Sequence, residues 1–391
     1  MTEEKRMAFS IGIYTQYYDN YNYGGNLQAF SLQRYIDNNI GKCEQVAIDF
    51  EYKKDIFYYL NNIKNSKGKK PNAVFIAIKY IAKNTLFLDA FIRLKQRRNR
   101  IKVFNNYILH SKNLFNVENV TESLNYSNYI CGSDCVWDMT NNPYCTALGF
   151  VPDKGKKISY AASLGSSAIP KGWPEKFLEY VKQLDAISVR EKSIAEELQK
   201  LIPEKDIFVA ADPTLLFTVN EWESFLYHKE RNEKYVLHYI LSEEHSQIQS
   251  ALKYTSNISF KSLTFPYIQN CINRNSFWQR NYGDIQNYSA DPLDFVELIK
   301  NAEVVVTDSF HAVIFSTLFH KPFYVLKRET QKDYVGRVEN FLEEIGLMSQ
   351  MISAEELAAI DSVPEIDFSY ADKVIAEKRE ASIKFLKDNL E

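Results

Sequence analysis

Long apolar runs and regularly spaced cysteines are both missing from this sequence of 391 residues. No stretch reaches the roughly 18 consecutive apolar residues of a membrane-spanning helix, and the first residues lack the apolar core of a secretory signal. We therefore expect a cytoplasmic protein. The cysteines are odd in number and irregularly spaced, which favours reduced thiols over a disulfide framework. They are Cys43, Cys131, Cys135, Cys145 and Cys271.

Neither a metal site nor a nucleic-acid surface is indicated. Cys131, Cys135 and Cys145 lie close together in the sequence, but they do not form the C-x-x-C pairs of a zinc site and have no histidine nearby. The formal net charge is only −3, so no global charge bias points to nucleic acid. Tyr and Phe are abundant, at 26 and 25 residues. This abundance fits core packing best, with sugar-stacking surfaces as the alternative.

Short apolar runs alternate with helical patterns along the whole chain. This alternation predicts an α/β fold in which parallel strands are joined by crossover helices. The length suits two domains of roughly 150 to 200 residues each. Charged residues and turn formers interrupt the rhythm at residues 218–232, so we expect domains at 1–222 and 223–391. The predicted strands are residues 9–14, 44–50, 127–134, 156–163, 185–190, 206–212, 235–241, 257–265, 303–309 and 321–326.

Two helical regions carry further information. Residues 52–125 are predicted to be mostly helical, and within them residues 86–109 form a basic amphipathic segment. Its basic side chains are Arg93, Lys95, Arg97, Arg98, Arg100 and Lys102. We favour a helix that packs on the sheet with a solvated face, and a helix lying on an anionic membrane surface is the alternative. The amphipathic helix at residues 372–390 could cross back to the first domain, as final helices do in two-domain folds of this kind.

Ligands of parallel sheets bind at the carboxyl ends of the strands, where this sequence places polar clusters. In "NYGGNLQA", Gly24 and Gly25 precede a helix whose amides could meet an anion or a hydroxyl-rich ligand, although a simple tight turn explains the motif equally well. In "CGSDCVWD", Asp134 could accept sugar hydroxyls while Trp137 stacks on a sugar face. The alternative for that motif is a helix cap by Ser133 or Asp134.

Two further clusters carry ionisable side chains. In "SVREKS", Arg190 ends a strand, where its guanidinium could hold a carboxylate or phosphate in fork geometry, or pair with Glu191. In "TDSFHA", His311 begins a helix beside Asp308 and Ser309, a setting that suits proton transfer. No nucleophile elbow surrounds Ser309, so we do not expect it to act as a nucleophile. The turn in "ADPTLLF" is interpreted as architectural.

Six motifs in a fixed order resemble those of the polysaccharide pyruvyl transferase family. They are "NYGGNLQAF", "GSDCVWD", "ISYAASLG", "ISVREKS", "ADPTLLF" and "VVVTDSFHAVIFSTLFHKPF", and the resemblance runs from residue 9 to residue 347. It implies two Rossmann-like domains similar to the GT-B glycosyltransferases, with the active site in the cleft between them. It also implies transfer of pyruvate from phosphoenolpyruvate onto two hydroxyls of a sugar as a cyclic ketal, in the biosynthesis of bacterial-type capsule or other cell-surface polysaccharide.

The resemblance further implies roles for individual residues. The catalytic group is His311, Arg190 and Asp308. The residues expected to bind the donor are Ser309, Arg337 and Lys321. Those expected to bind the acceptor are Asn22, Gly24, Gly25, Asn26, Asp134 and Trp137. Relatives carry an arginine where this chain has Ser309, so we expect Arg190 or Arg337 to hold the negative charge of the donor.

No cofactor and no metal are implied, since phosphoenolpyruvate is a co-substrate. The expected acceptor is a sugar, carried by a lipid-linked oligosaccharide at the inner face of the membrane, with which the protein could make peripheral contact. Two alternatives stay open. One is a GT-B glycosyltransferase that uses a nucleotide sugar. The other is a non-catalytic glycan-binding protein, which the missing arginine at position 309 would explain.

Overall fold

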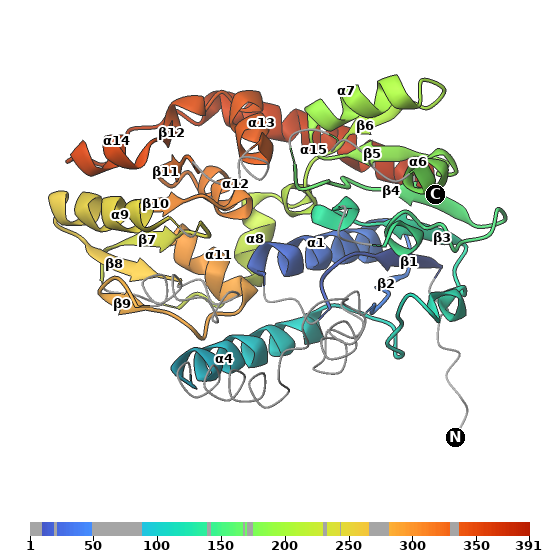
Figure 1. Ribbon diagram of the computed structural model, residues 1–391, viewed down its shortest axis with the longest axis horizontal. Coiled ribbons are helices and arrows are strands. Elements are labelled where there is room, and N and C mark those ends of the chain that lie inside the picture. The colour runs from blue at the N-terminus through green and yellow to red at the C-terminus, as the bar shows by residue number, and fades with distance from the viewer. Residues whose placement is uncertain are drawn as a thin grey trace, which may run out of the picture.

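The computed structural model describes residues 10–18, 22–48, 88–138, 142–166, 169, 175–229, 233–242, 244–265, 281–328 and 336–391. Strands and helices alternate through these ranges, as the sequence predicts (Figure 1). The α-helices are α1 (Tyr23–Asn39), α4 (Leu88–Phe104), α5 (Pro143–Thr146), α6 (Glu175–Lys182), α7 (Lys192–Leu201), α8 (Val219–Phe225), α9 (His245–Asn257), α11 (Pro292–Lys300), α12 (Phe310–Leu318), α13 (Gly336–Glu344), α14 (Ala354–Ala359) and α15 (Ser369–Leu390). Of the predicted helical region 52–125, residues 52–87 lie outside the described ranges.

The N-terminal half of the chain, through β6, is built on a parallel sheet with the strand order β2-β1-β3-β4. The strands are β1 (Ile11–Tyr14), β2 (Cys43–Gln45), β3 (Asn128–Cys131), β4 (Lys156–Ser159), β5 (Ile187–Val189) and β6 (Ile207–Val209). β5 and β6 pair with each other, and isolated bridges such as Ala162 with Val189 join them to the sheet. β2 ends earlier than predicted, with only a single bridge at Ile48 beyond it, and residues 49–50 lie outside the described part.

The C-terminal half, from β7 onward, contains a second sheet with the order β12-β11-β10-β7-β8-β9. Its strands are β7 (Tyr235–Tyr239), β8 (Lys261–Thr264), β9 (Ile285–Gln286), β10 (Val304–Thr307), β11 (Phe323–Leu326) and β12 (Met351–Ile352), all paired in parallel. β7, β10 and β11 are buried at every position, as strands are when both faces of a sheet are covered. The two parallel sheets confirm the predicted α/β class with two Rossmann-like units.

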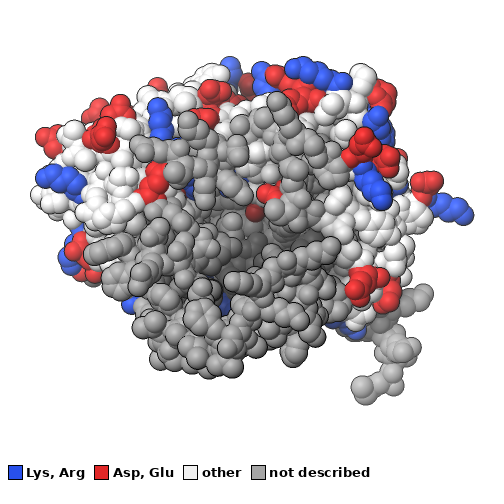
Figure 2. All heavy atoms as spheres, in the orientation of Figure 1, with Lys and Arg blue, Asp and Glu red and all other residues white. Residues whose placement is uncertain are grey.

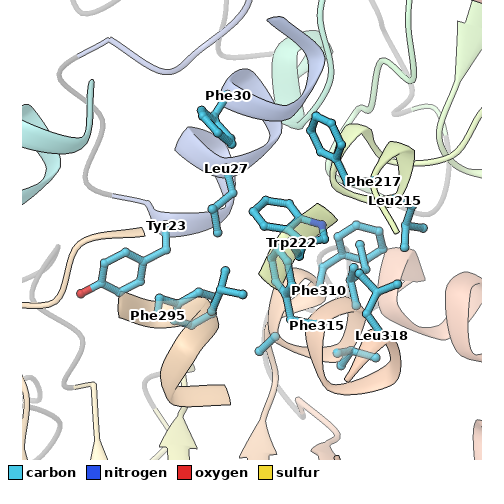
Figure 3. Packing of buried hydrophobic residues seen from close by; sticks show 14 of the residues in the cluster. Tyr23, Leu27, Phe30, Leu215, Phe217, Trp222, Phe295, Phe310, Phe315 and Leu318 are labelled. Atoms are coloured by element: carbon cyan, nitrogen blue, oxygen red, sulfur yellow. The ribbon is translucent and has the colours of Figure 1, made fainter. Parts of the chain in front are cut away.

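The two halves share a continuous apolar core. Trp222 of α8 is fully buried, its Nε1 donates to the carbonyl oxygen of Thr214 at 2.9 Å, and its ring packs edge-on against Phe315 of α12. Figure 3 shows Trp222 between α12 and the side chains of Leu27 and Phe30 on α1. The expected boundary between residues 222 and 223 therefore falls inside a helix, and the division into domains 1–222 and 223–391 stays a prediction.

The final helix, α15, contacts the N-terminal half. The backbone N–H of Ala211 donates to Oγ of Ser382 at 2.8 Å, and Nε of Arg379 donates to the carbonyl oxygen of Leu215 at 2.6 Å. The rings of Phe208 and Phe385 stack with centroids 5.0 Å apart. The carboxyl end of the chain accordingly lies beside β4 to β6 in Figure 1.

α4 turns several of its arginines toward the C-terminal half. The guanidinium of Arg93 lies over the ring of Tyr288 at 4.1 Å, and Nη2 of Arg100 donates to Asp291 at 2.7 Å and to Asp294 at 3.0 Å. These contacts agree with the favoured interpretation of a helix packed on the protein. On the face drawn in Figure 2, described side chains of both charges are interspersed. No helix within the described ranges combines the length and hydropathy needed to cross a membrane.

Candidate functional site

A cavity of about 500 Å³ lies between the two halves. The N-terminal half contributes residues that follow β5 and β6, and the C-terminal half contributes residues of α12, α13 and α15. The charged side chains of the lining are Arg190, Glu191, Lys192, Asp212, Arg337, Glu343, Glu344 and Lys378. Parallel sheets bind ligands at the carboxyl ends of their strands, and this cavity lies at such ends.

His311 lies next to this cavity, in the first turn of α12. The buried strand β10 ends at Thr307, and Ser309 takes the extended conformation of an N-cap, so that the helix begins at Phe310. The ring of His311 is buried, and its Nε2 lies 3.5 Å from Oδ2 of Asp212. Nε2 has no hydrogen-bond partner in the described part of the chain. Nε2 therefore faces the Asp212 carboxylate from just beyond good hydrogen-bond distance, and a small shift of the ring decides between this partner and a ligand oxygen.

Gly24 brings the start of α1 against the same ring. The side chain of Asn22 caps α1 by accepting a hydrogen bond from the Gly24 N–H at 2.9 Å. A Cβ on Gly24 would lie 2.0 Å from Nδ1 of His311, so only glycine permits this approach. The next glycine, Gly25, and Asn26 lie in the same helical turn. The structure thus joins the predicted acceptor motif of the N-terminal half to the predicted catalytic histidine of the C-terminal half.

Asp212 is the residue that the sequence interpretation missed, because its turn was taken as architectural. Its Oδ1 does accept hydrogen bonds from the N–H and Oγ1 of Thr214, at 3.0 and 2.7 Å, as in a turn. Its Oδ2 faces the site and accepts a hydrogen bond from Nη1 of Arg190 at 2.9 Å. Burial alone would raise the pKa of this carboxyl, but the nearby His311 and Arg190 lower it below its ordinary value. Asp212 is therefore an ionised link between the two cationic candidates.

Arg190 is buried and contacts three residues, Asp212, Glu191 and Phe310. Besides its bond to Asp212, its Nε donates to Oε1 of Glu191 at 3.0 Å, and its guanidinium lies 4.3 Å from the ring centre of Phe310. Burial opposes its charge, but the carboxylates of Glu191 and Asp212 raise its pKa. The sequence left open whether Arg190 binds an anion or pairs with Glu191. In the structure it pairs with Glu191 and also lines the cavity. Its Nη2 is buried and has no hydrogen-bond partner among the described residues, so one nitrogen of the guanidinium keeps its donors unused there.

Asp134 and Arg337 complete the charged lining from opposite halves. Oδ1 of Asp134 lies 3.9 Å from Nη1 of Arg190 and 3.8 Å from Nη1 of Arg337. Nη1 of Arg337 also donates to Sγ of Cys135 at 2.9 Å. Asp134 has φ 61° and ψ −163°, a conformation that is almost restricted to glycine. Its side chain makes no cap hydrogen bond to the following 3₁₀ helix, so the alternative role as a helix cap is not observed.

Asp308 and Ser309 lie beside His311, but Asp308 is turned to other partners. Its carboxylate accepts hydrogen bonds from the N–H groups of Leu241 and Ser242, at 2.7 and 2.8 Å, and from Nε of Arg328 at 2.8 Å. No hydrogen bond between Asp308 and His311 occurs in the structure described. The carboxylate is thus positioned to fix the ends of β7, β10 and β11 rather than to exchange a proton with His311. Arg328 was not singled out from the sequence, because nothing in "VLKRET" marks it.

Lys321 and Trp137 are not brought to the site in the expected way. Lys321 precedes β11, whereas His311 follows β10, and because these strands are parallel the two residues lie at opposite edges of the sheet. Trp137 is buried to 1% exposure in the second core cluster, where its Nε1 donates to the carbonyl oxygen of Thr146 at 3.1 Å. Its ring packs edge-on against Phe177. The expectation that Trp137 stacks on a sugar is therefore corrected, since neither face of the ring is open.

No group of three or more His, Cys, Asp and Glu side chains within the described ranges is arranged to hold a metal ion. The described ionisable side chains linked to one another beside His311 are instead Arg190, Arg337, Asp134, Glu191 and Asp212. Arginine forks bind carboxylate and phosphate groups, and imidazole transfers protons near neutral pH. The site can therefore bind a small anion and deliver a proton to it.

Comparison with solved structures finds proteins of similar length and low identity. A UDP-GlcNAc 2-epimerase from Methanocaldococcus jannaschii is 12% identical, with 97% of this chain and 93% of that chain covered at a TM-score of 0.48. A UDP-GlcNAc 2-epimerase from Neisseria meningitidis, bound to UDP-GlcNAc, is 13% identical, with 95% and 99% covered at 0.43. Arabidopsis thaliana UGT89C1, complexed with UDP-L-rhamnose, is 8% identical, with 98% and 96% covered at 0.47.

Sequence comparison is more specific. No curated protein sequence matches the chain. The sequence model of the polysaccharide pyruvyl transferase family matches residues 22–330, which include the start of α1, the cavity residues that follow β5 and β6, and the first turn of α12. This match covers well over half of the 391 residues. The chain therefore belongs to the polysaccharide pyruvyl transferase family.

Proposed function

We propose that this protein transfers the pyruvyl group of phosphoenolpyruvate onto two hydroxyls of one sugar residue, as a cyclic ketal, during the synthesis of a cell-surface polysaccharide. The family membership supports a transferase that acts on a polysaccharide. The observation that carries the proposal is the buried Nε2 of His311, which lacks a hydrogen-bond partner in the described structure and lies where the two halves meet. A proton donor and neighbouring arginines are what this reaction requires.

The reaction makes two demands that these residues can meet. In the first step a sugar hydroxyl oxygen bonds to C2 of phosphoenolpyruvate and gives up its proton, while C3 gains a proton and becomes a methyl group. In the second step the other hydroxyl oxygen bonds to C2, the bond from C2 to the phosphate oxygen breaks, and inorganic phosphate leaves with the proton of this hydroxyl. We assign proton delivery to His311. Arg190 and Arg337 bind the donor's negative charge, because both line the cavity beside it.

We place the acceptor sugar at the start of α1 and at Asp134. This assignment is supported by Asn22, Gly25 and Asn26, which belong to the turn that meets His311 through Gly24. The carboxylate of Asp134 accepts hydroxyl hydrogen bonds. Trp137 has no part in this assignment because its ring is buried.

We extend the proposal to an acceptor carried on a lipid at the inner face of the membrane. Lys102, Val103, Tyr107 and Leu109, in the last turn of α4 and just after it, are exposed. Basic and apolar side chains together suit an anionic lipid surface. Sedimentation with phosphatidylglycerol vesicles tests this: Lys102→Glu with Val103→Asp should reduce binding, and unchanged binding would contradict the membrane contact.

We also propose that the reaction needs neither cofactor nor metal, because the arginines supply the positive charge that a metal would otherwise provide. Turnover should be unchanged after treatment with a chelator. Loss of turnover that returns with added Mg²⁺ or Mn²⁺ would contradict this part of the proposal.

The main experiment incubates the purified protein with phosphoenolpyruvate and a panel of lipid-linked oligosaccharides. Phosphate release and the mass of the acceptor are measured together. The expected result is one phosphate released for each pyruvyl ketal formed, and no product with His311→Ala that remains folded by circular dichroism. Transfer from UDP- or GDP-sugars instead would establish a glycosyltransferase. Glycan binding without phosphate release would establish a non-catalytic binding protein.

A further inference from the structure

The end of β11 brings Arg328 beside the end of β10. β10 and β11 are parallel neighbours, with Thr307 paired to Val325. The residues that follow these two strands therefore lie side by side at the carboxyl ends of the strands. Arg328 donates from Nε to Oδ2 of Asp308 at 2.8 Å and from Nη2 to the carbonyl oxygen of Asp308 at 3.5 Å. Its guanidinium thus lies against the peptide that joins Asp308 to Ser309.

The contact with Asp308 neutralises the charge of Arg328 only in part. Asp308 is already bound by the N–H groups of Leu241 and Ser242, so its negative charge is shared among three donors. Nη1 of Arg328 makes no hydrogen bond to any described residue. Arg190, in contrast, lies between the carboxylates of Glu191 and Asp212. Arg328 therefore keeps more of its charge for a ligand than Arg190 does.

The neighbouring helix start favours an anion at the same place. Ser309 is the N-cap of α12, but its side chain makes no cap hydrogen bond, and the N-terminus of a nine-residue helix attracts negative charge. The second feature is Arg328 itself, whose side chain is 9% exposed and whose Nη1 makes no hydrogen bond to a described residue. Arg328, the helix start and His311 are all carried by two adjacent strand ends.

We propose that the guanidinium of Arg328, at the end of β11, binds the donor. The resemblance implies an arginine at the position of Ser309, at the end of β10, and Arg328 takes the role of that arginine. The ligand it binds is the phosphate or carboxylate of the donor. This inference rests on the proposed function. Asp308 is then a positioning residue that aims the guanidinium.

The test compares Arg328→Gln with the wild type for phosphate release and for binding of phosphoenolpyruvate by calorimetry. We expect KM for phosphoenolpyruvate to rise by about tenfold or more, because a charge-assisted contact is lost, with a smaller change in KM for the acceptor. Arg100→Gln is the matched control, since Arg100 also bonds to aspartates but lies on α4. The double variant Ser309→Arg with Arg328→Gln should recover donor binding, because it returns the cation to the relatives' position.

Folding is separated from donor binding by a second pair of variants. Arg328→Gln leaves Asp308 buried without its ion partner, so Asp308→Asn with Arg328→Gln removes both charges. A raised KM for phosphoenolpyruvate in this folded double variant supports the proposal. An unchanged KM in a folded Arg328 variant, or no recovery with Ser309→Arg, would overturn it. If the wild type neither binds phosphoenolpyruvate nor releases phosphate, the proposed function itself has failed.

Discussion

Asp212 and His311 come from opposite halves of the chain and meet with Oδ2 and Nε2 3.5 Å apart. Asp212 follows β6 and is held by Thr214, whereas His311 lies at the start of α12. A carboxylate fixed beside an imidazole orients the ring. The pair forms only when both halves pack together, so the geometry of this site depends on the core that joins α1, α8 and α12.

The first prediction concerns turnover. Asp212→Asn keeps the size of the side chain and its turn but removes the negative charge beside His311. We expect the rate of phosphate release to fall by about 10²-fold, because general acid catalysis typically contributes a factor of this size to the rate. Steady-state assays with saturating donor measure this, and the circular dichroism spectrum checks the fold. Full activity in Asp212→Asn would show that the pair does not act in catalysis.

The second prediction concerns stability and pH. Although burial opposes ionisation, His311 and Arg190 lower the pKa of Asp212 from its ordinary value of 3.8, so the ionised carboxylate stabilises the folded state. This stabilisation is complete above the unfolded pKa and is lost as the pH falls through the lower, folded pKa. The difference in unfolding free energy between the wild type and Asp212→Asn should therefore shrink as the pH falls from about 5 toward 3. Urea unfolding across this range measures it, and a difference that grows on acidification would contradict the sign.

The third prediction uses two glycines of the same region. Gly24→Ala would place a methyl group 2.0 Å from Nδ1 of His311, whereas Gly41→Ala would meet no described atom closer than 3.6 Å. We expect Gly24→Ala to displace the ring and lower turnover by about 10²-fold, and Gly41→Ala to retain it. Equal activity of the two variants would mean that the start of α1 does not set the position of His311.

Sequence patterns predict the class of fold because buried strands and their polar ends repeat along the chain. Residues that contact others nearby in sequence, such as Asn22 capping α1, are predictable for the same reason. The pairings across the halves are not, since neither the turn at Asp212 nor Arg328 after β11 carries a local signal of its partner. Trp137 was misinterpreted because an aromatic residue after a strand has the same pattern in a core as in a sugar site.

The fourth prediction separates backbone strain from charge at Asp134. Its φ of 61° and ψ of −163° cost a non-glycine residue about 1–3 kcal/mol. Asp134→Gly and Asp134→Ala both remove the carboxylate that lies near Arg190 and Arg337, so both should weaken acceptor turnover equally. Only the glycine variant relieves the backbone. We therefore expect Asp134→Gly to be more stable than Asp134→Ala by about 1 kcal/mol or more, the reverse of the usual order for these residues.

Urea unfolding of the two variants measures this difference. The unfolding free energy must fall with urea concentration at the same slope in both variants for the comparison to hold. Asp134→Asn serves as the control because asparagine has the same shape as aspartate and keeps the strained backbone. If Asp134→Ala is as stable as Asp134→Gly, the backbone at this position is relaxed in solution. If the glycine variant is more stable than the alanine variant and less active than the wild type, Asp134 is held in a strained conformation because its carboxylate is needed between the two arginines.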